Sequence, residues 1–340
     1  MPKTIMPFSM TGIGSVPHTD PADACELILR TFDIPFWPQL PKISFKESMI
    51  AQYSEGMPNV RINEQGQSIR IDRAASDEID RFYESWTEET KIAMSDDYAR
   101  GLHAFLRRIR GRRFRCLKGH ITGPVTFTLG LKDSDGKLVF YDEELREISL
   151  MVLKAKARWQ IDLLRQHSDD VILFVDEPIL SALGSSSYLG ISNDEVRRLL
   201  EEITSSIRQA GAMPGIHCCG RADWSVPLHC GTGILSFDSF EYFDSIAIYA
   251  DEVRAFLEAG GYLAWGMVPT SDAISNIDDI ALISAMKGYL ETLASFVPRE
   301  LLLSRILLTP ACGTGTRTVE ETIKAFQLLI RLKEGLREQS

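Results

Sequence analysis

Residues 172 to 178 read Ile172-Leu173-Phe174-Val175-Asp176-Glu177-Pro178, an apolar run that ends abruptly in two acids and a proline. A short, continuous apolar run is typical of a strand that is buried on both faces of a parallel sheet. Seven other short apolar runs occur along the chain, at residues 10–13, 35–40, 116–121, 213–217, 234–237, 262–265 and 306–308. The sequence therefore predicts eight strands of one kind.

Amphipathic helical patterns separate most of these runs. They cover residues 22–31, 141–167, 193–210, 251–259, 278–296 and 318–334. Strands that alternate with helices in this way indicate a parallel sheet covered by helices. Eight such units in a chain of 340 residues predict an α/β protein that folds as a single (β/α)8 TIM barrel over residues 1–340.

One connection is much longer than the others and runs from residue 54 to residue 113. Within it, residues 60–71 alternate apolar and polar side chains around Asn63-Glu64-Gln65-Gly66-Gln67, which predicts a β-hairpin. Residues 77–110 then follow a helical pattern. We expect a hairpin-plus-helix insertion at residues 54–113, between the second and third strands. Long insertions into barrel loops are often functional.

The overall composition narrows the class of protein. The net charge of −10 at pH 7 argues against nucleic-acid binding, although the arginines of residues 107–113 fit either a phosphate contact or a solvated helix end. The N-terminus lacks the apolar run of a signal peptide, and no stretch approaches the ~20 apolar residues of a membrane span. Six cysteines in 340 residues do not suggest a disulfide scaffold. We expect a cytoplasmic protein with no membrane or nucleic-acid partner.

Polar segments rich in glycine and proline follow almost every predicted strand at once. They are residues 14–19, 122–126, 176–178, 217–220, 238–241, 266–270 and 309–312. Local turn chemistry explains each Gly-Pro pair, but it does not explain why Asp, His and Cys recur at the same point of successive units. Because all strands of a barrel open their carboxyl ends onto one face, we expect these side chains to converge in one pocket.

Three soft side chains in these segments suit a metal site. His217 and Cys219 lie just past one strand end, where alternate residues face the same way, and Cys312 follows the last strand. Imidazole and thiolate are zinc ligands, and a site with three protein ligands keeps a position open, as catalytic zinc sites do. The alternative is a buried histidine beside cysteines that serve only in packing. Cys218 is assigned to packing because it faces away from its neighbours.

A fourth ligand is open to choice. Asp238 is the first residue beyond the sixth strand, and its carboxylate suits zinc and is displaceable by an incoming thiolate. Glu241 is the rival for that place. For both residues the third possibility is a solvated loop acid.

The ligand set itself favours one kind of chemistry. Two thiolates and a neutral imidazole largely cancel the charge of zinc, so that the ion is a poor activator of water but still binds a soft thiol. A metal-bound thiol loses its proton near neutral pH. A cysteine-rich open site is therefore better suited to thiol alkylation than to hydrolysis, which tends to use His and carboxylate ligands.

Four further polar residues are candidates for substrate binding. Asp176 ends the fourth strand, where its carboxylate can accept hydrogen bonds from a substrate amine or cap a helix. Ser15 offers a hydroxyl and a backbone N–H to a carboxylate. Glu47 is either a second acceptor for an amine or a surface helix position, and His18 is either a proton carrier near the pocket or a turn-stabilising histidine.

Together these elements resemble the catalytic barrel of cobalamin-independent methionine synthase. More broadly they resemble the superfamily that this enzyme shares with uroporphyrinogen decarboxylase and the zinc-dependent corrinoid methyltransferases. The resemblance covers essentially the whole chain. It rests on the order and the strand-end placement of five elements, at residues 13–19, 122–126, 175–178, 217–219 and 310–313.

The resemblance implies a zinc ion held by three protein ligands, which are His217, Cys219 and Cys312. Ser15 and Asp176 match the positions that hold the amino-acid end of homocysteine, and Glu47 is a looser match. Asp238 falls where the family has a ligand Glu. Asp176 is therefore the predicted catalytic residue, and Ser15, Glu47 and Asp176 are the predicted substrate-binding residues.

Two departures from the family bear on the methyl donor. The full-length synthase carries a second, N-terminal barrel, whereas this chain begins at the first strand of the catalytic one. The family also has a catalytic His in the loop after the seventh strand, where this chain reads Trp265-Gly266-Met267-Val268-Pro269-Thr270. Folate is a poor leaving group that needs protonation, whereas reduced cobalt departs unaided. We therefore expect a methylated corrinoid (methylcobalamin) or a corrinoid carrier protein as donor.

The expected function is zinc-dependent transfer of a methyl group to the thiol of homocysteine, which gives methionine. Two other enzymes remain as alternatives: a methyltransferase that acts on another thiol such as coenzyme M, and a metal-free enzyme like uroporphyrinogen decarboxylase. A non-catalytic corrinoid-binding or zinc-storage module is a third. The strand ends lack the several arginines that a porphyrin substrate demands.

Overall fold

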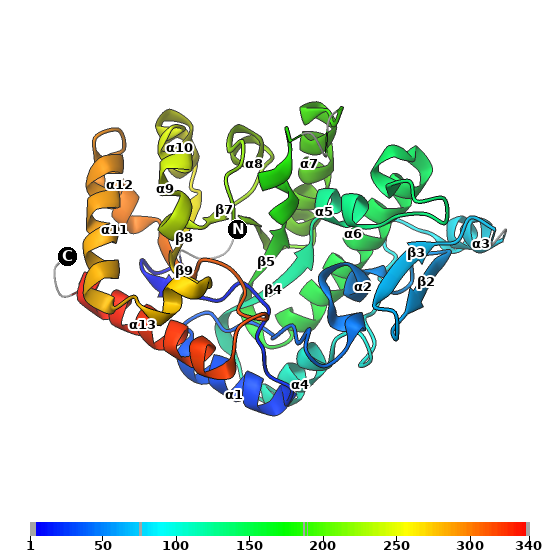
Figure 1. The fold of residues 1–340 in the computed structure, drawn as a ribbon, viewed down its shortest axis with the longest axis horizontal. Helices are drawn as coiled ribbons and strands as arrows, with labels where there is room; N and C mark the ends of the chain where they lie inside the picture. Colours follow the sequence, from blue (N-terminus) through cyan, green and yellow to red (C-terminus); the bar gives the residue numbers. More distant parts are fainter. Residues whose placement is uncertain (1–4, 75–76, 186–187, 189, 338–340) are drawn as a thin grey trace.

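The protein, described by a computed structural model at residues 5–74, 77–185, 188 and 190–337, is built on a curled parallel sheet (Figure 1). Seven strands form this sheet in the order β1-β9-β8-β7-β6-β5-β4. Their bounds are β1 (Ser9–Met10), β4 (Phe114–Thr122), β5 (Ser168–Asp176), β6 (Met213–Cys218), β7 (Ile234–Phe237), β8 (Tyr262–Val268) and β9 (Ile306–Pro310). The α/β class is confirmed, and the arrangement is TIM-barrel-like.

Helices connect the strands and cover the outer face of the sheet (Figure 1). The longer ones are α1 (Pro21–Thr31), α6 (Glu143–Arg165), α7 (Asn193–Gln209), α11 (Asp279–Ala294) and α13 (Val319–Arg337). The shorter ones are α2 (Met49–Ser54), α5 (Pro124–Gly130), α8 (Ser225–His229), α9 (Ser239–Ala247), α10 (Ala250–Glu258) and α12 (Arg299–Ser304). Several begin at a side-chain cap: Asp142 accepts the N–H of Leu145 at the start of α6, for example, which satisfies an otherwise unpaired backbone donor.

The expectation of eight regular strands is wrong in one place. The segment of residues 34–39 is not a strand of the sheet but is joined to both of its edges. Ile34 N–H donates to Met10 on the β1 side, and Lys118 N–H of β4 donates to Pro35. Isolated bridges join Ser15 to Gln39 and Phe36 to Lys118. The reason lies in the sequence, because the prolines of this segment have no N–H for a regular ladder.

The long connection contains a hairpin and two separate helices. Strands β2 (Val60–Asn63) and β3 (Ser68–Ile71) pair antiparallel, with Val60 opposite Ile71. Helices α3 (Glu78–Ser85) and α4 (Arg100–Arg108) follow, so the continuous helical stretch expected at residues 77–110 is wrong across residues 86–99. Residues 86–99 contain no proline, but they are rich in Thr, Glu and Asp. They lack the apolar spacing that would bury one face of a helix. The definition of residues 54–113 as an insertion within one domain stays a prediction.

The inner face of the sheet changes character along the strands. Along β5, Ile172, Phe174 and Asp176 share one face because side chains alternate along a strand. The first two belong to a buried apolar cluster inside the sheet, and the third lies at the carboxyl end. The same change occurs on β6 between Met213 and His217. The polar side chains thus gather where the strands end, over a packed apolar floor.

Within the described parts of the chain, no helix combines the length and the apolar character that a membrane crossing requires.

Candidate metal centre

His217 is held in one orientation by its neighbour on the next strand. It lies near the end of β6, is 2% exposed, and its Nδ1 lies 2.9 Å from the hydroxyl of Ser236 on β7. The other ring nitrogen, Nε2, is buried and lacks a hydrogen-bond partner in the described structure. Because Ser236 occupies Nδ1, Nε2 is the atom left free to bind a ligand.

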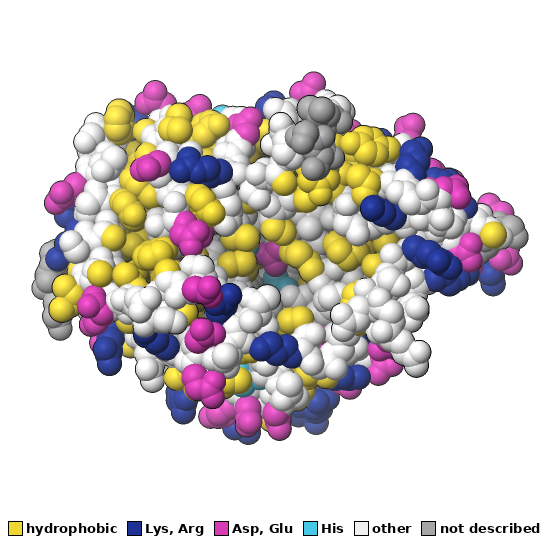
Figure 2. Space-filling model, in the orientation of Figure 1, with side chains coloured by type: hydrophobic (Ala, Val, Ile, Leu, Met, Phe, Trp, Pro, Cys, Tyr) yellow, Lys and Arg dark blue, Asp and Glu magenta, His cyan; other side chains and the backbone are white. Residues whose placement is uncertain are grey.

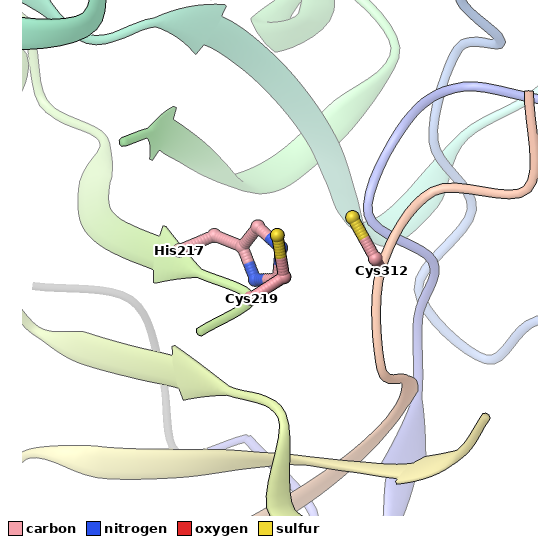
Figure 3. Close-up of side chains that lie close together, drawn as sticks. All are labelled: His217, Cys219 and Cys312. Atoms are coloured by element: carbon pink, nitrogen blue, oxygen red, sulfur yellow. The ribbon is translucent and has the colours of Figure 1, made fainter. Parts of the chain in front are cut away.

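The two predicted cysteine ligands meet this imidazole. A nitrogen of His217 and the sulfurs of Cys219 and Cys312 all lie within 4.8 Å of one another, and Figure 3 shows the two sulfurs and the ring grouped around one space. Ligands of a tetrahedral zinc lie roughly 3.5–3.8 Å apart, given bonds of about 2.0–2.3 Å. The three side chains therefore fit a zinc ion with small adjustments.

The neighbouring Cys218 behaves as the strand alternation predicts. It is buried in the outer core, and its thiol donates to the carbonyl of Gly220. Burial raises its pKa to about 12, so it is an inert thiol. Cys219, in contrast, is only partly buried. Two adjacent cysteines thus face opposite sides of the sheet, and one of them faces His217.

The two thiols of the cluster interact, and the pKa values of the pair separate. The interaction with Cys312 and the nearby His217 holds the pKa of Cys219 below its usual value. The interaction with Cys219 and burial raise the pKa of Cys312. A thiolate beside an unpaired imidazole nitrogen is the donor chemistry that zinc selects.

The candidates for a fourth ligand lie outside this group. The described His, Cys, Asp and Glu side chains that cluster here are His217, Cys219 and Cys312. Asp238 is buried, but its Oδ1 caps α9 by accepting the N–H of Glu241. Glu241 is exposed and accepts from the hydroxyl of Ser271. Asp238 has one carboxylate oxygen left to offer, and Glu241 is a surface acid.

Asp176 lies directly beside His217. The two are register partners on β5 and β6, and neighbouring strands lie about 4.8 Å apart. Asp176 is buried, and its Oδ1 has no hydrogen-bond partner in the described structure. Burial raises its pKa to about 6, against the opposing influence of His217 and Lys118. An unpaired buried carboxylate oxygen is an acceptor that awaits a cationic or donor group.

Ser15 packs against the loop that carries Cys312. Its carbonyl accepts the N–H of Thr314 at 2.8 Å, and its hydroxyl accepts the N–H of Gly315 at 3.3 Å. A Cβ placed on Gly313 would lie 2.1 Å from the hydroxyl oxygen of Ser15. The glycines after Cys312 are thus required for the close approach of the two loops, which brings Ser15 next to the segment that carries Cys312.

Glu47 is neither exposed nor free. It is fully buried, so the surface-position alternative is wrong, and its two carboxylate oxygens accept the N–H groups of Leu40 and Arg100. Burial raises its pKa to about 7. These bonds fix the two loops on either side of it, and its binding of an amine stays a prediction. His18 is buried, and burial lowers its pKa.

Sequence reasoning did not identify Ser236 or His120 as parts of this region. Ser236 gives no signal in the sequence, because only the register between β6 and β7 places it beside His217. His120 precedes the segment of residues 122–126 by two positions, and the alternation of strand β4 puts it on the same face as Thr122. The two-residue spacing between His120 and Thr122 was the signal in the sequence that could have identified His120.

Figure 2 shows the face of the molecule that is hollowed near its centre, where a histidine and an acidic side chain are visible among uncharged ones.

The comparisons with known proteins bear on the fold. No protein-family model matches the chain, and no curated protein sequence does. Among solved structures, a B12-independent methionine synthase from Shewanella sp. W3-18-1, in complex with selenomethionine, is similar at a TM-score of 0.63, with 13% identity over 99% of both chains. A glycoside hydrolase gives 0.45 with 10% identity over 97% of this chain and 99% of its own. The first similarity supports the TIM-barrel-like fold.

Proposed function

We propose that the protein is a zinc-dependent methyltransferase that methylates the thiol of homocysteine to give methionine. The observation that carries the proposal is the meeting of His217, Cys219 and Cys312 within 4.8 Å at the carboxyl ends of the strands. The similar fold of a methionine synthase that was solved with selenomethionine supports the same class of ligand.

The chemistry follows from the donor set and its neighbours. His217, Cys219 and Cys312 would hold the zinc, which would lower the pKa of a bound thiol so that it is available as the thiolate. Asp176 accepts hydrogen bonds from the substrate ammonium, for which its unpaired Oδ1 is suited. Ser15, which packs against the loop that carries Cys312, binds the carboxylate. Both contacts orient the substrate sulfur, and burial of Asp176 and His217 keeps water away.

For the methyl donor we propose a methylated corrinoid, free or on a carrier protein. The loop that follows β8 contains no histidine, and transfer from folate requires an acid to protonate the departing nitrogen. Transfer from cobalt requires none, because the electron pair of the carbon–cobalt bond remains on the cobalt as the carbon–sulfur bond forms.

Two measurements test this function. Metal analysis of the purified protein is expected to give one zinc per chain. Methionine formation is then measured with homocysteine and either methylcobalamin or methyl-tetrahydrofolate, and we expect turnover with methylcobalamin. Turnover with methyl-tetrahydrofolate alone would contradict the proposal of a corrinoid donor. Full activity of zinc-free protein would contradict the zinc-dependent mechanism.

The two alternative activities are tested by supplying coenzyme M or a porphyrin in place of homocysteine. A methyltransferase for coenzyme M would prefer that thiol to homocysteine. A decarboxylase would release carbon dioxide from a porphyrin without metal.

A further inference from the structure

The imidazole of His120 is buried without any partner. It is 1% exposed, and both ring nitrogens are buried and unpaired. Within the described chain it is the one histidine of which this is true. His103, by comparison, has its Nε2 2.8 Å from the carbonyl of Met94. A buried polar group without a partner is unfavourable and is retained where water or a ligand supplies the missing hydrogen bond.

The ring is nevertheless held firmly in place. It stacks on Trp37 with ring centroids 3.8 Å apart, and a Cβ at Gly14 would lie 3.0 Å from Nδ1. The main chain of His120 is fixed by Gln160, which accepts its N–H and donates to its carbonyl, and by the hydroxyl of Tyr53. The imidazole is therefore pre-organised rather than loosely packed.

His120 lies at the proposed amino-acid pocket. Gly14, which its ring approaches, directly precedes Ser15. Thr122, two residues further along the same face of β4, is the register partner of Asp176. Tyr53, which bonds to the His120 carbonyl at 2.7 Å, also lies close enough to Asp176 for that charge to raise its pKa. The ring thus lies against the residue that precedes Ser15, on the strand face that ends two residues later beside Asp176.

The neutral state of this imidazole determines what it can bind. Burial and the nearby Lys118 hold its pKa well below the usual value. A neutral imidazole has one N–H donor and one acceptor nitrogen. Ser15 is the proposed partner of the substrate carboxylate. The ring N–H of His120 is a second hydrogen-bond donor that suits the same carboxylate.

We propose that His120 is a further substrate-binding residue, whose ring N–H donates a hydrogen bond to the α-carboxylate of the amino-acid thiol. This inference rests on the proposed function, and it names the recognition of the carboxylate as the step to which His120 contributes.

The experiment compares H120M with the matched control H103M in zinc-loaded protein. Calorimetric titration with L-homocysteine is expected to give a dissociation constant about 10-fold higher for H120M than for wild type, since a hydrogen bond to a charged group is lost. With 3-aminopropane-1-thiol, which lacks the carboxylate, the two proteins should bind equally. H103M should bind both thiols as wild type does.

Thermal unfolding gives an independent measurement. H120M removes two unsatisfied buried atoms and is expected to raise the midpoint, whereas H103M removes a satisfied one and should lower it. Equal homocysteine binding by H120M and wild type, or equal weakening with both thiols, would overturn the proposal. If wild type binds neither thiol, the proposed function has failed, and a lowered midpoint for H120M then overturns this inference as well.

Discussion

The hydroxyl of Ser236 on β7 lies 2.9 Å from Nδ1 of His217 on β6. This contact leaves the opposite nitrogen, Nε2, without a hydrogen-bond partner in the described structure, and it comes from a residue that would not itself bind a metal. Hydrogen-bonded neighbours of this kind set the orientation and tautomer of a ligand histidine.

Replacing this serine should weaken zinc binding. For Ser236→Ala we expect a zinc dissociation constant about 10-fold higher, the lower end of the range for such neighbours, measured by competition with a chromogenic chelator. Ser245→Ala is the control, because Ser245 is a buried serine that bonds to Trp224 instead. An unchanged zinc affinity in Ser236→Ala would show that the ring is oriented by packing alone.

The two adjacent cysteines should differ sharply. Cys219→Ser and Cys312→Ser remove proposed ligands and should each weaken zinc binding by more than the roughly 10–100-fold that a hydrogen-bonded neighbour contributes. Cys218→Ala, on the opposite face of the strand, should keep one zinc per chain. Metal analysis after dialysis distinguishes them, and zinc retained by Cys312→Ser would contradict the site.

Asp176 should matter for substrates that carry an amine. Asp176→Asn removes the charge that we propose faces the ammonium, and we expect KM for homocysteine to rise about 10- to 100-fold, since hydrogen bonds to charged groups contribute about 1.5–3 kcal/mol. KM for 2-mercaptoethanol, which has no amine, should change little. An equal loss with both thiols would assign Asp176 a different role.

The glycine after Cys312 should be intolerant of a side chain. Gly313→Ala places a Cβ against the hydroxyl of Ser15, so we expect a lower unfolding midpoint and weaker homocysteine binding. Gly288→Ala is the control, because a Cβ there meets nothing within 4 Å inside α11, and the change should stabilise the protein by about 0.5–1 kcal/mol. Wild-type binding by Gly313→Ala would refute the close contact.

Buried Glu47 should make stability depend on pH in an unusual direction. Its pKa is about 7 in the folded protein, against a usual value of 4.5. The folded state therefore holds a proton that the unfolded state has released, so the free energy of unfolding falls as the pH rises from about 4.5 to 7. In Glu47→Gln this part of the slope should be missing in urea titrations between these pH values. A slope equal to that of wild type would assign it to other groups.

The order of strands and helices was readable from the sequence because apolar runs and helical periodicity report burial directly. Residues 234–237 were predicted as a strand with the bounds that β7 has. The segment of residues 35–40 was not so readable, because its apolar side chains look like a strand while its prolines prevent a regular ladder. The helical prediction for residues 77–110 failed across residues 86–99, where buried residues such as Met94 and Ala99 lie in an irregular segment and not on one face of a helix.

The sequence by itself determined which residue types stand at the strand ends, including His217, Cys219 and Cys312, because alternation along a strand and the shared face of a barrel are local rules. Only the tertiary structure decided that these three atoms lie within 4.8 Å, that Glu47 is buried on backbone N–H groups, and that Ser236 and His120 belong to the region. Distances across strands depend on register and on the curl of the sheet, and these are set by the packing of the whole core.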